Sequence, residues 1–172
     1  MNVLFHTSAA IGVIALVVET NKTYSLFSLK SIKLGFISFV FGIVSHGILD
    51  IIPHCYPFNS KIDAIASFLI MITSIFLIRK KYRLMVGMAF LGSVFPDLID
   101  LSPQILNKYL GFSLPEFDQF FPWHQHAYSG SIYGQNCNQS IIYQILTILV
   151  VVVICYFNKG KLKRLFTSNV SN

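Results

Sequence analysis

The sequence predicts an all-α protein, a multi-pass transmembrane helical bundle with about five spans and a long aromatic outer loop. Of its 172 residues, 54% are hydrophobic and only 12% are charged, whereas a soluble domain carries roughly 25% charged residues. The apolar residues come in long runs, and a spanning helix needs about 20 such residues, with a range of roughly 17–25. The length suits one compact bundle, so we expect residues 1–172 to form a single integral-membrane domain.

Five apolar segments are the expected spans, at about residues 3–18, 34–52, 62–78, 84–101 and 141–157. The first is short, and Thr7 and Ser8 weaken it, so we expect it to be tilted, extended at its ends or only partly inserted. The other four are long enough to cross.

The loop at residues 102–140 is rich in aromatic side chains, which prefer the headgroup level of a membrane. We therefore expect this loop to lie at the outer surface and to contact membrane lipid. Its prolines should break it into short pieces; they are Pro103, Pro115 and Pro122.

The basic residues predict the orientation, because cytoplasmic loops of membrane proteins are enriched in Lys and Arg. In this chain 11 of the 13 Lys and Arg fall in the first loop, the third loop and the tail. With five spans these regions share one side, so we expect an integral membrane protein with its N-terminus outside and its C-terminus in the cytoplasm. The net charge of +6 follows from this flanking pattern and does not predict nucleic-acid binding.

All five histidines and six of the seven acidic residues fall on the predicted outer side. Ionisable groups in a membrane are costly and usually functional, and imidazoles with carboxylates are ligands of zinc-like ions. The segregation therefore predicts a divalent metal site, with zinc as the favoured ion. The expected ligands are His6, His46, Asp50, His54, Asp97, His124 and His126.

The most specific candidate metal-binding motif lies at the end of the second segment. His46 and Asp50 lie four residues apart and share a helix face. Pro53 then ends or kinks the helix, so His54 could fold back toward the same point. The alternative interpretation is a buried hydrogen-bonded His–Asp pair without an ion.

The end of the fourth segment carries Asp97 and Asp100, three residues apart on one face, with Pro96 beside them. Carboxylates near a helix C-terminus cost roughly 0.3–1 kcal/mol each, and a cation would offset this cost because no Lys or Arg is near in sequence. Alternatively, the two acids only mark the outer boundary of the helix. Asp63 differs, because it follows Ser60 in a capping pattern and is expected to be structural.

The remaining histidines carry weaker signals. His124 and His126 would point the same way in an extended segment, so both could bind one ion or two. His6 has a predicted depth that matches His46 and Asp97, although a lone histidine is usually a satisfied core residue.

The sequence leaves the cysteine chemistry open. Cys55 and Cys137 share the predicted outer side and could form a disulfide, but no motif requires it.

Together these elements resemble the bacterial integral-membrane proteins described as membrane-bound metal-dependent hydrolases. The resemblance rests on His6, Ser45-His46-x3-Asp50-x2-Pro53-His54, Phe95-Pro96-Asp97-x2-Asp100 and His124-x-His126. The acidic element is one residue longer than the family's P-D-x-D. The H-x3-D element is also similar to the zinc-dependent phospholipase C group, in which His and Asp on one helix bind a zinc cluster.

The resemblance and the ligands favour metal-dependent hydrolysis of a phosphoester in lipid or headgroup material, with Asp100 as a catalytic base. A non-catalytic protein with a structural metal site is the alternative. Transport of a metal ion or proton is disfavoured, because the inner halves of the segments are nearly free of ionisable residues. The oligomeric state stays open.

Overall fold

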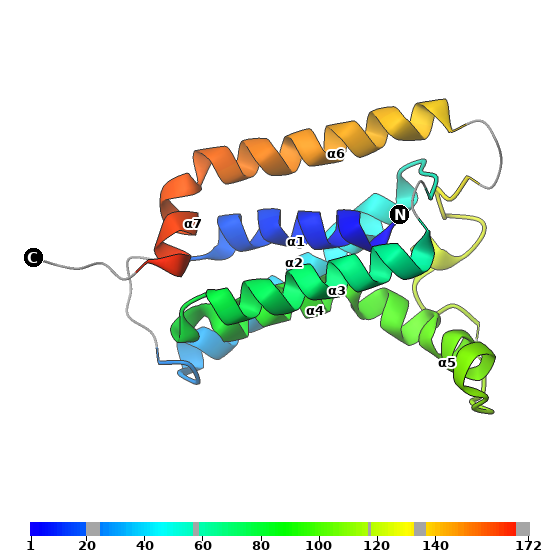
Figure 1. Cartoon of the computed structure of the whole chain (residues 1–172), viewed down its shortest axis with the longest axis horizontal. Coiled ribbons are helices and arrows are strands. Elements are labelled where there is room, and N and C mark those ends of the chain that lie inside the picture. The colour runs from blue at the N-terminus through cyan, green and yellow to red at the C-terminus, as the bar shows by residue number, and fades with distance from the viewer. Residues whose placement is uncertain (20–24, 57–58, 117, 133–136, 168–172) are drawn as a thin grey trace, which may run out of the picture.

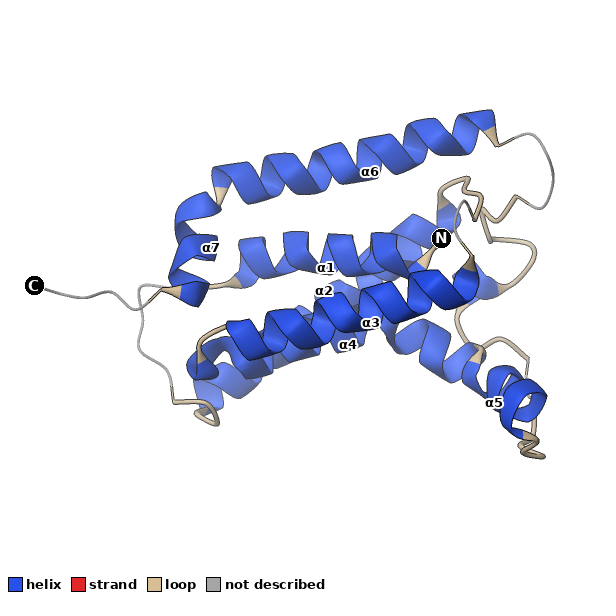
Figure 2. Cartoon of the chain, in the orientation of Figure 1, coloured by secondary structure: helices blue, strands red, loops and turns tan. Residues whose placement is uncertain are grey.

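The computed structural model describes residues 1–19, 25–56, 59–116, 118–132 and 137–167. Within these ranges every regular element is a helix, as predicted (Figure 2). Lys22, Phe117 and Tyr133, which contribute to the basic and aromatic patterns, lie outside the described residues.

Four helices are long and apolar enough to cross a membrane. They are α2 (Leu29–Ile51), α3 (Ser60–Leu77), α4 (Arg83–Asp100), which follows the 3-10 turn η1 (Lys80–Tyr82), and α6 (Asn138–Phe157). Large apolar side chains on α3 and α6 are exposed, as expected of faces that contact lipid. Helix α2 begins five residues earlier than predicted because Ser28 caps it, accepting a hydrogen bond from the Ser31 backbone at 3.3 Å.

The first predicted span forms helix α1 (Val3–Val17), which has 15 residues. It contacts α2, α3, α4 and α6, so it lies among the long helices rather than at their edge (Figure 1). Small residues such as Ala10, Gly12 and Ala15 are buried on it and let its neighbours approach closely. That α1 itself crosses the membrane stays a prediction.

The contact between α2 and α4 positions the candidate site. A Cβ atom at Gly92 would lie 2.1 Å from the Phe39 carbonyl oxygen, and one at Gly42 would lie 2.7 Å from the Ala89 carbonyl oxygen. The two backbones therefore meet directly, which only glycine permits. Because the contact fixes the two helices along their length, the C-terminal end of α2 lies beside that of α4.

The two ends of the bundle differ in charge. The short helix α7 (Lys159–Phe166) lies at the end opposite α5 (Ser102–Leu110) and the N-terminus (Figure 1). It meets the junction of α3 and α4, where the Arg79 backbone donates to the Leu165 carbonyl at 2.9 Å. Basic segments therefore gather at one end, and the predicted ligands at the other.

The predicted outer loop is partly helical. Its first piece is α5, with Pro103 in the first turn and Gly111 ending it at φ 69°. A 3-10 turn, η2, covers Pro122–His124. A disulfide between Cys55 and Cys137 ties the segment after α2 to the start of α6, which settles the pairing that the sequence leaves open.

Candidate metal centre

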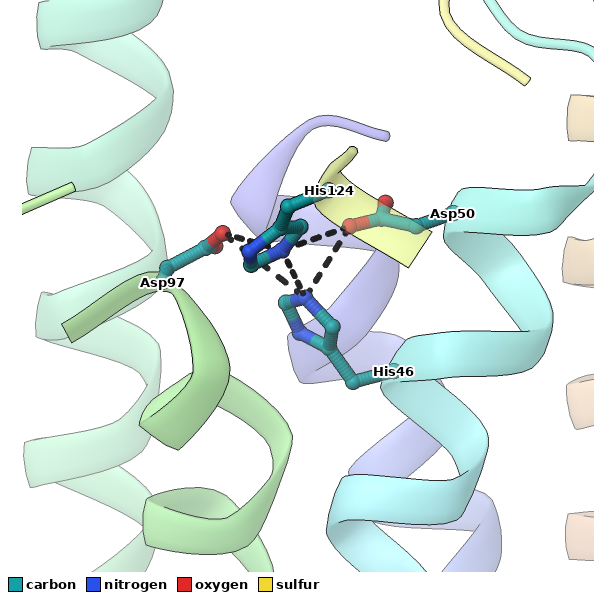
Figure 3. A group of neighbouring side chains, drawn as sticks. All are labelled: His46, Asp50, Asp97 and His124. Atoms are coloured by element: carbon teal, nitrogen blue, oxygen red, sulfur yellow. Dashed lines mark hydrogen bonds and ion pairs between the residues drawn. The ribbon is translucent and has the colours of Figure 1, made fainter. Parts of the chain in front are cut away.

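Four of the predicted ligands meet at one point (Figure 3). His46 and Asp50 come from the last turns of α2, Asp97 comes from α4, and His124 comes from η2. One ligand atom from each residue lies within 4.8 Å of the others. Three separate elements therefore supply one candidate metal centre, hereafter the His/Asp cluster.

Five of the six distances between the ligand atoms are close to the edges of a tetrahedral site. His46 Nε2 lies 3.1 Å from His124 Nε2 and 3.0 Å from Asp50 Oδ2. His124 Nε2 lies 3.2 Å from Asp50 Oδ2, and Asp97 Oδ1 lies 3.3 Å from His124 Nε2 and 3.7 Å from His46 Nε2. A tetrahedron with bonds of about 2.1 Å has edges of roughly 3.4 Å. The donor set of two imidazole nitrogens and two carboxylate oxygens also fits zinc.

Both imidazoles are held in the orientation that a metal ligand needs. His46 Nδ1 donates to the Ser93 carbonyl at 2.7 Å. A carbonyl only accepts, so the proton is on Nδ1 and Nε2 faces the cluster. His124 Nδ1 lies 2.7 Å from Asp100 Oδ2, which gives the same arrangement with a carboxylate. Metal-bound histidines usually have such a second partner.

Asp100 lies behind His124. Its Oδ1 accepts from the Phe120 backbone at 2.9 Å, and its Oδ2 also accepts from the Phe121 backbone at 3.1 Å. The side chain is only 2% exposed. These contacts are those of a carboxylate that orients a histidine, and the catalytic-base role expected from the sequence stays a prediction.

His124 lies outside the long helices, and its protonation follows from its neighbours. Burial would lower its pKa, but hydrogen bonds to Asp50, Asp97 and Asp100 outweigh burial and raise the pKa to about 10. The imidazole therefore keeps its proton at neutral pH without an ion, and an ion that binds Nε2 must displace that proton.

Two glycines allow the segment between α5 and α6 to reach the cluster. A Cβ atom at Gly47 would lie 2.8 Å from the Trp123 ring, so the indole packs directly on α2 beside His124. A Cβ atom at Gly130 would lie 2.3 Å from the Ile52 carbonyl oxygen, and the Gly130 backbone donates to the Asp50 carbonyl at 2.7 Å. These contacts hold the return segment against the end of α2.

The other predicted ligands surround the cluster. The buried His6 ring stacks on His46 with centroids 3.9 Å apart, and its Nε2 lies 3.2 Å from Asp50 Oδ1. The Met1 amine also contacts Asp50. His54 Nδ1 donates to the Ile52 carbonyl at 2.7 Å, and burial lowers its pKa to about 4.

His126 is exposed and is not part of the cluster. The expectation that it points the same way as His124 assumed an extended segment. That assumption is wrong, because His124 ends a 3-10 turn. The alternating geometry of a strand therefore does not apply at these positions.

Asp63 has a structural role, but it does not cap its own helix as predicted. Asn59 caps α3 by accepting from the Lys61 backbone at 3.0 Å. Asp63 instead accepts from the backbones of Val3 at 2.7 Å and Leu4 at 3.1 Å, so it caps α1.

Sequence reasoning missed several residues that position the ligands. No local pattern identifies Ser93, Gly47 or Gly130, because each acts through a distant segment. Trp123 could have been identified from the sequence, because it is the single tryptophan of the chain and directly precedes His124.

Comparison with models of protein families found no match to this chain, and comparisons with curated proteins and with solved structures found none either. The resemblance to membrane-bound metal-dependent hydrolases therefore stays a prediction.

Proposed function

We propose that this chain is a membrane-embedded, metal-dependent hydrolase that acts on phosphoesters of lipids or their headgroups. The observation that supports this most is the His/Asp cluster, in which four ligand atoms converge while both imidazoles are oriented by second partners. His46, Asp50, Asp97 and His124 would hold the ion, and zinc fits the donor set. When bound, such an ion supplies Lewis acidity that polarises a phosphoryl oxygen and makes water a stronger acid.

The surrounding groups orient the two histidines, and one side of the cluster is left open to substrate. Asp100 and the Ser93 carbonyl hold the two imidazoles in place. The imidazoles therefore need not reorient during the reaction. Asp97 is the most open of the four, with its side chain 24% exposed against 8% for Asp50. We therefore place the approach of substrate on the Asp97 side.

We also propose that the cluster faces the outside of a bacterial inner membrane. The disulfide between Cys55 and Cys137 lies at the end of the bundle that carries the His/Asp cluster, and disulfides persist in oxidising compartments. The opposite end carries the Lys and Arg of η1 and α7, as the cytoplasmic side should. The N-terminus would then lie outside and the C-terminus inside.

A non-catalytic metal site is the second candidate. Four protein ligands can complete a tetrahedral ion, and structural zinc sites are closed in this way, whereas catalytic sites keep a position open. In that case the ion would only tie α2, α4 and η2 together.

Turnover by zinc-loaded protein separates the two candidates. The purified protein would be offered phospholipids, lipid pyrophosphates and a generic phosphodiester, and products would be measured by phosphate release and mass spectrometry. We expect turnover of at least one lipid phosphoester, lost with a chelator and restored by zinc.

Two variants make this test specific. Asp50→Asn should lose both metal and activity, whereas Asp118→Asn, at an exposed outer position, should keep both. Zinc-loaded protein that turns over none of these compounds would favour the structural metal site.

A further inference from the structure

A long cavity leads away from the His/Asp cluster between α3 and α4. Its volume is about 930 Å³, within the range of roughly 300–1,000 Å³ that holds small ligands. Asp50, Asp97 and His124 line one end of it. A ligand in this cavity would therefore touch the proposed metal ligands.

The body of the cavity is apolar. Met71 and Ile75 line it from α3, and Phe90 and Val94 line it from α4. Its lining runs along α4 from Gly87 to Leu98 and continues onto α5; the α4 part alone is about 16 Å long at the helical rise per residue. The hydrocarbon core of a bilayer is about 30 Å thick, so the cavity is as long as one leaflet is deep.

The end near the cluster carries polar groups beside the apolar side chains of Leu98 and Ile105. The hydroxyls of Tyr56 and Ser131, which line this end, lie 2.9 Å apart. Asn2 also lines the cavity, is 3% exposed, and its side-chain oxygen has no hydrogen-bond partner among the described residues. Buried polar atoms usually have a partner, so a polar group of a ligand would satisfy this one.

The cavity is open along its side. Phe68 on α3 and Leu91 on α4 line it and are 62% and 42% exposed. Both belong to helices that can cross a membrane, so this opening faces lipid chains. A ligand could enter sideways from the bilayer without passing through water.

We propose that the groove between α3 and α4 holds the apolar chain of a membrane lipid and places its phosphoester at the His/Asp cluster. This rests on the proposed function and narrows its substrate class to lipids that carry a long hydrocarbon chain. The polar end, the apolar body and the leaflet-deep length are together the shape of an amphiphile. A water-soluble phosphoester would leave the apolar body unfilled.

Gly87 offers a variant that fills the groove. A Cβ atom there would contact only Ile75 Cδ1, at 3.9 Å, so the side chain of Gly87→Leu has space to enter. Leucine is also the better helix former, by roughly 1 kcal/mol, so the variant should fold. Gly160→Leu is the matched control, because a Cβ atom at Gly160 has no neighbour within 4 Å and Gly160 lies on α7.

The test is photo-crosslinking in lipid nanodiscs that contain a small fraction of a phosphatidic acid with a diazirine at the end of one acyl chain. In the native protein, mass spectrometry should find label on residues 60–77 and 83–100 that an excess of unlabelled phosphatidic acid removes. Label on the lipid-facing side of α6 should resist this competition. Gly87→Leu displaces about two methylene groups and should lower the competed label about tenfold, whereas Gly160→Leu should not change it.

Label on α3 and α4 that behaves like label on α6 would overturn the proposal, and so would crosslinks in the groove to a second copy of the chain. The result is independent of turnover. Competed label without turnover of any phosphoester would support the lipid groove while it contradicts the hydrolase.

Discussion

Replacing Asp100 with asparagine tests whether this carboxylate orients His124. Asp100 Oδ2 accepts from His124 Nδ1 at 2.7 Å and from the Phe121 backbone at 3.1 Å, while Oδ1 accepts from the Phe120 backbone at 2.9 Å. An amide has the same shape but only one oxygen. In Asp100→Asn the NH2 group must therefore face at least one of these donors. In either orientation of the amide the negative charge is lost, so the bond to His124 Nδ1 is no longer charge-assisted and His124 is held less firmly.

The expected effect is on metal affinity. Loss of a second partner of a metal-bound histidine typically costs about 10–100-fold in affinity, or roughly 1.4–2.7 kcal/mol. Because all four proposed ligands remain, zinc should still bind. If Asp100 is instead the catalytic base, turnover should fall while the zinc Kd stays unchanged.

Competition with a chromophoric zinc chelator would measure the Kd of the purified protein. Asp118→Asn is the matched control, because it removes the same charge at an exposed position in the segment between α5 and η2. A zinc Kd in Asp100→Asn equal to that of the native protein would refute the orienting role.

Three further predictions concern stability, measured by thermal unfolding in detergent. Asp63→Asn should cost about 0.5–1 kcal/mol, because Asp63 caps α1, and should leave the zinc Kd unchanged. Gly92→Ala should lower the free energy of unfolding by about 1–3 kcal/mol or more, because the new Cβ atom would lie 2.1 Å from a backbone oxygen. An unchanged Tm would contradict the close contact between α2 and α4. Replacing both Cys55 and Cys137 with serine should cost about 2–4 kcal/mol, and a reductant should lower the Tm of the native protein but not of this variant.

Local sequence patterns predict much of the fold. Apolar runs identify α2, α3, α4 and α6 to within a few residues at most ends, because a spanning helix must be continuously apolar. The shared face of His46 and Asp50 follows from helical periodicity alone. Pro53 marks the end of α2 because it cannot continue a helix.

The features that the sequence does not predict depend on contacts between distant segments. Asp63 caps a helix about 60 residues away rather than its own. Asp100 faces His124 because η2 folds back over the end of α4, and nothing near Asp100 in the chain signals this. His124 joins the cluster and His126 does not, because His124 ends a 3-10 turn. The two-residue spacing in the sequence does not reveal this turn.

X-ray absorption at the zinc edge, combined with metal analysis, tests the central claim most directly. Zinc-loaded native protein should hold one ion per chain with nitrogen and oxygen ligands at about 2.0–2.2 Å, including two imidazoles and no sulfur. His46→Ala and His124→Ala should each lose the ion or one imidazole from its spectrum, whereas His126→Ala should match the native protein. A native spectrum without imidazole, or one that neither His46→Ala nor His124→Ala changes, would contradict the His/Asp cluster as a metal centre.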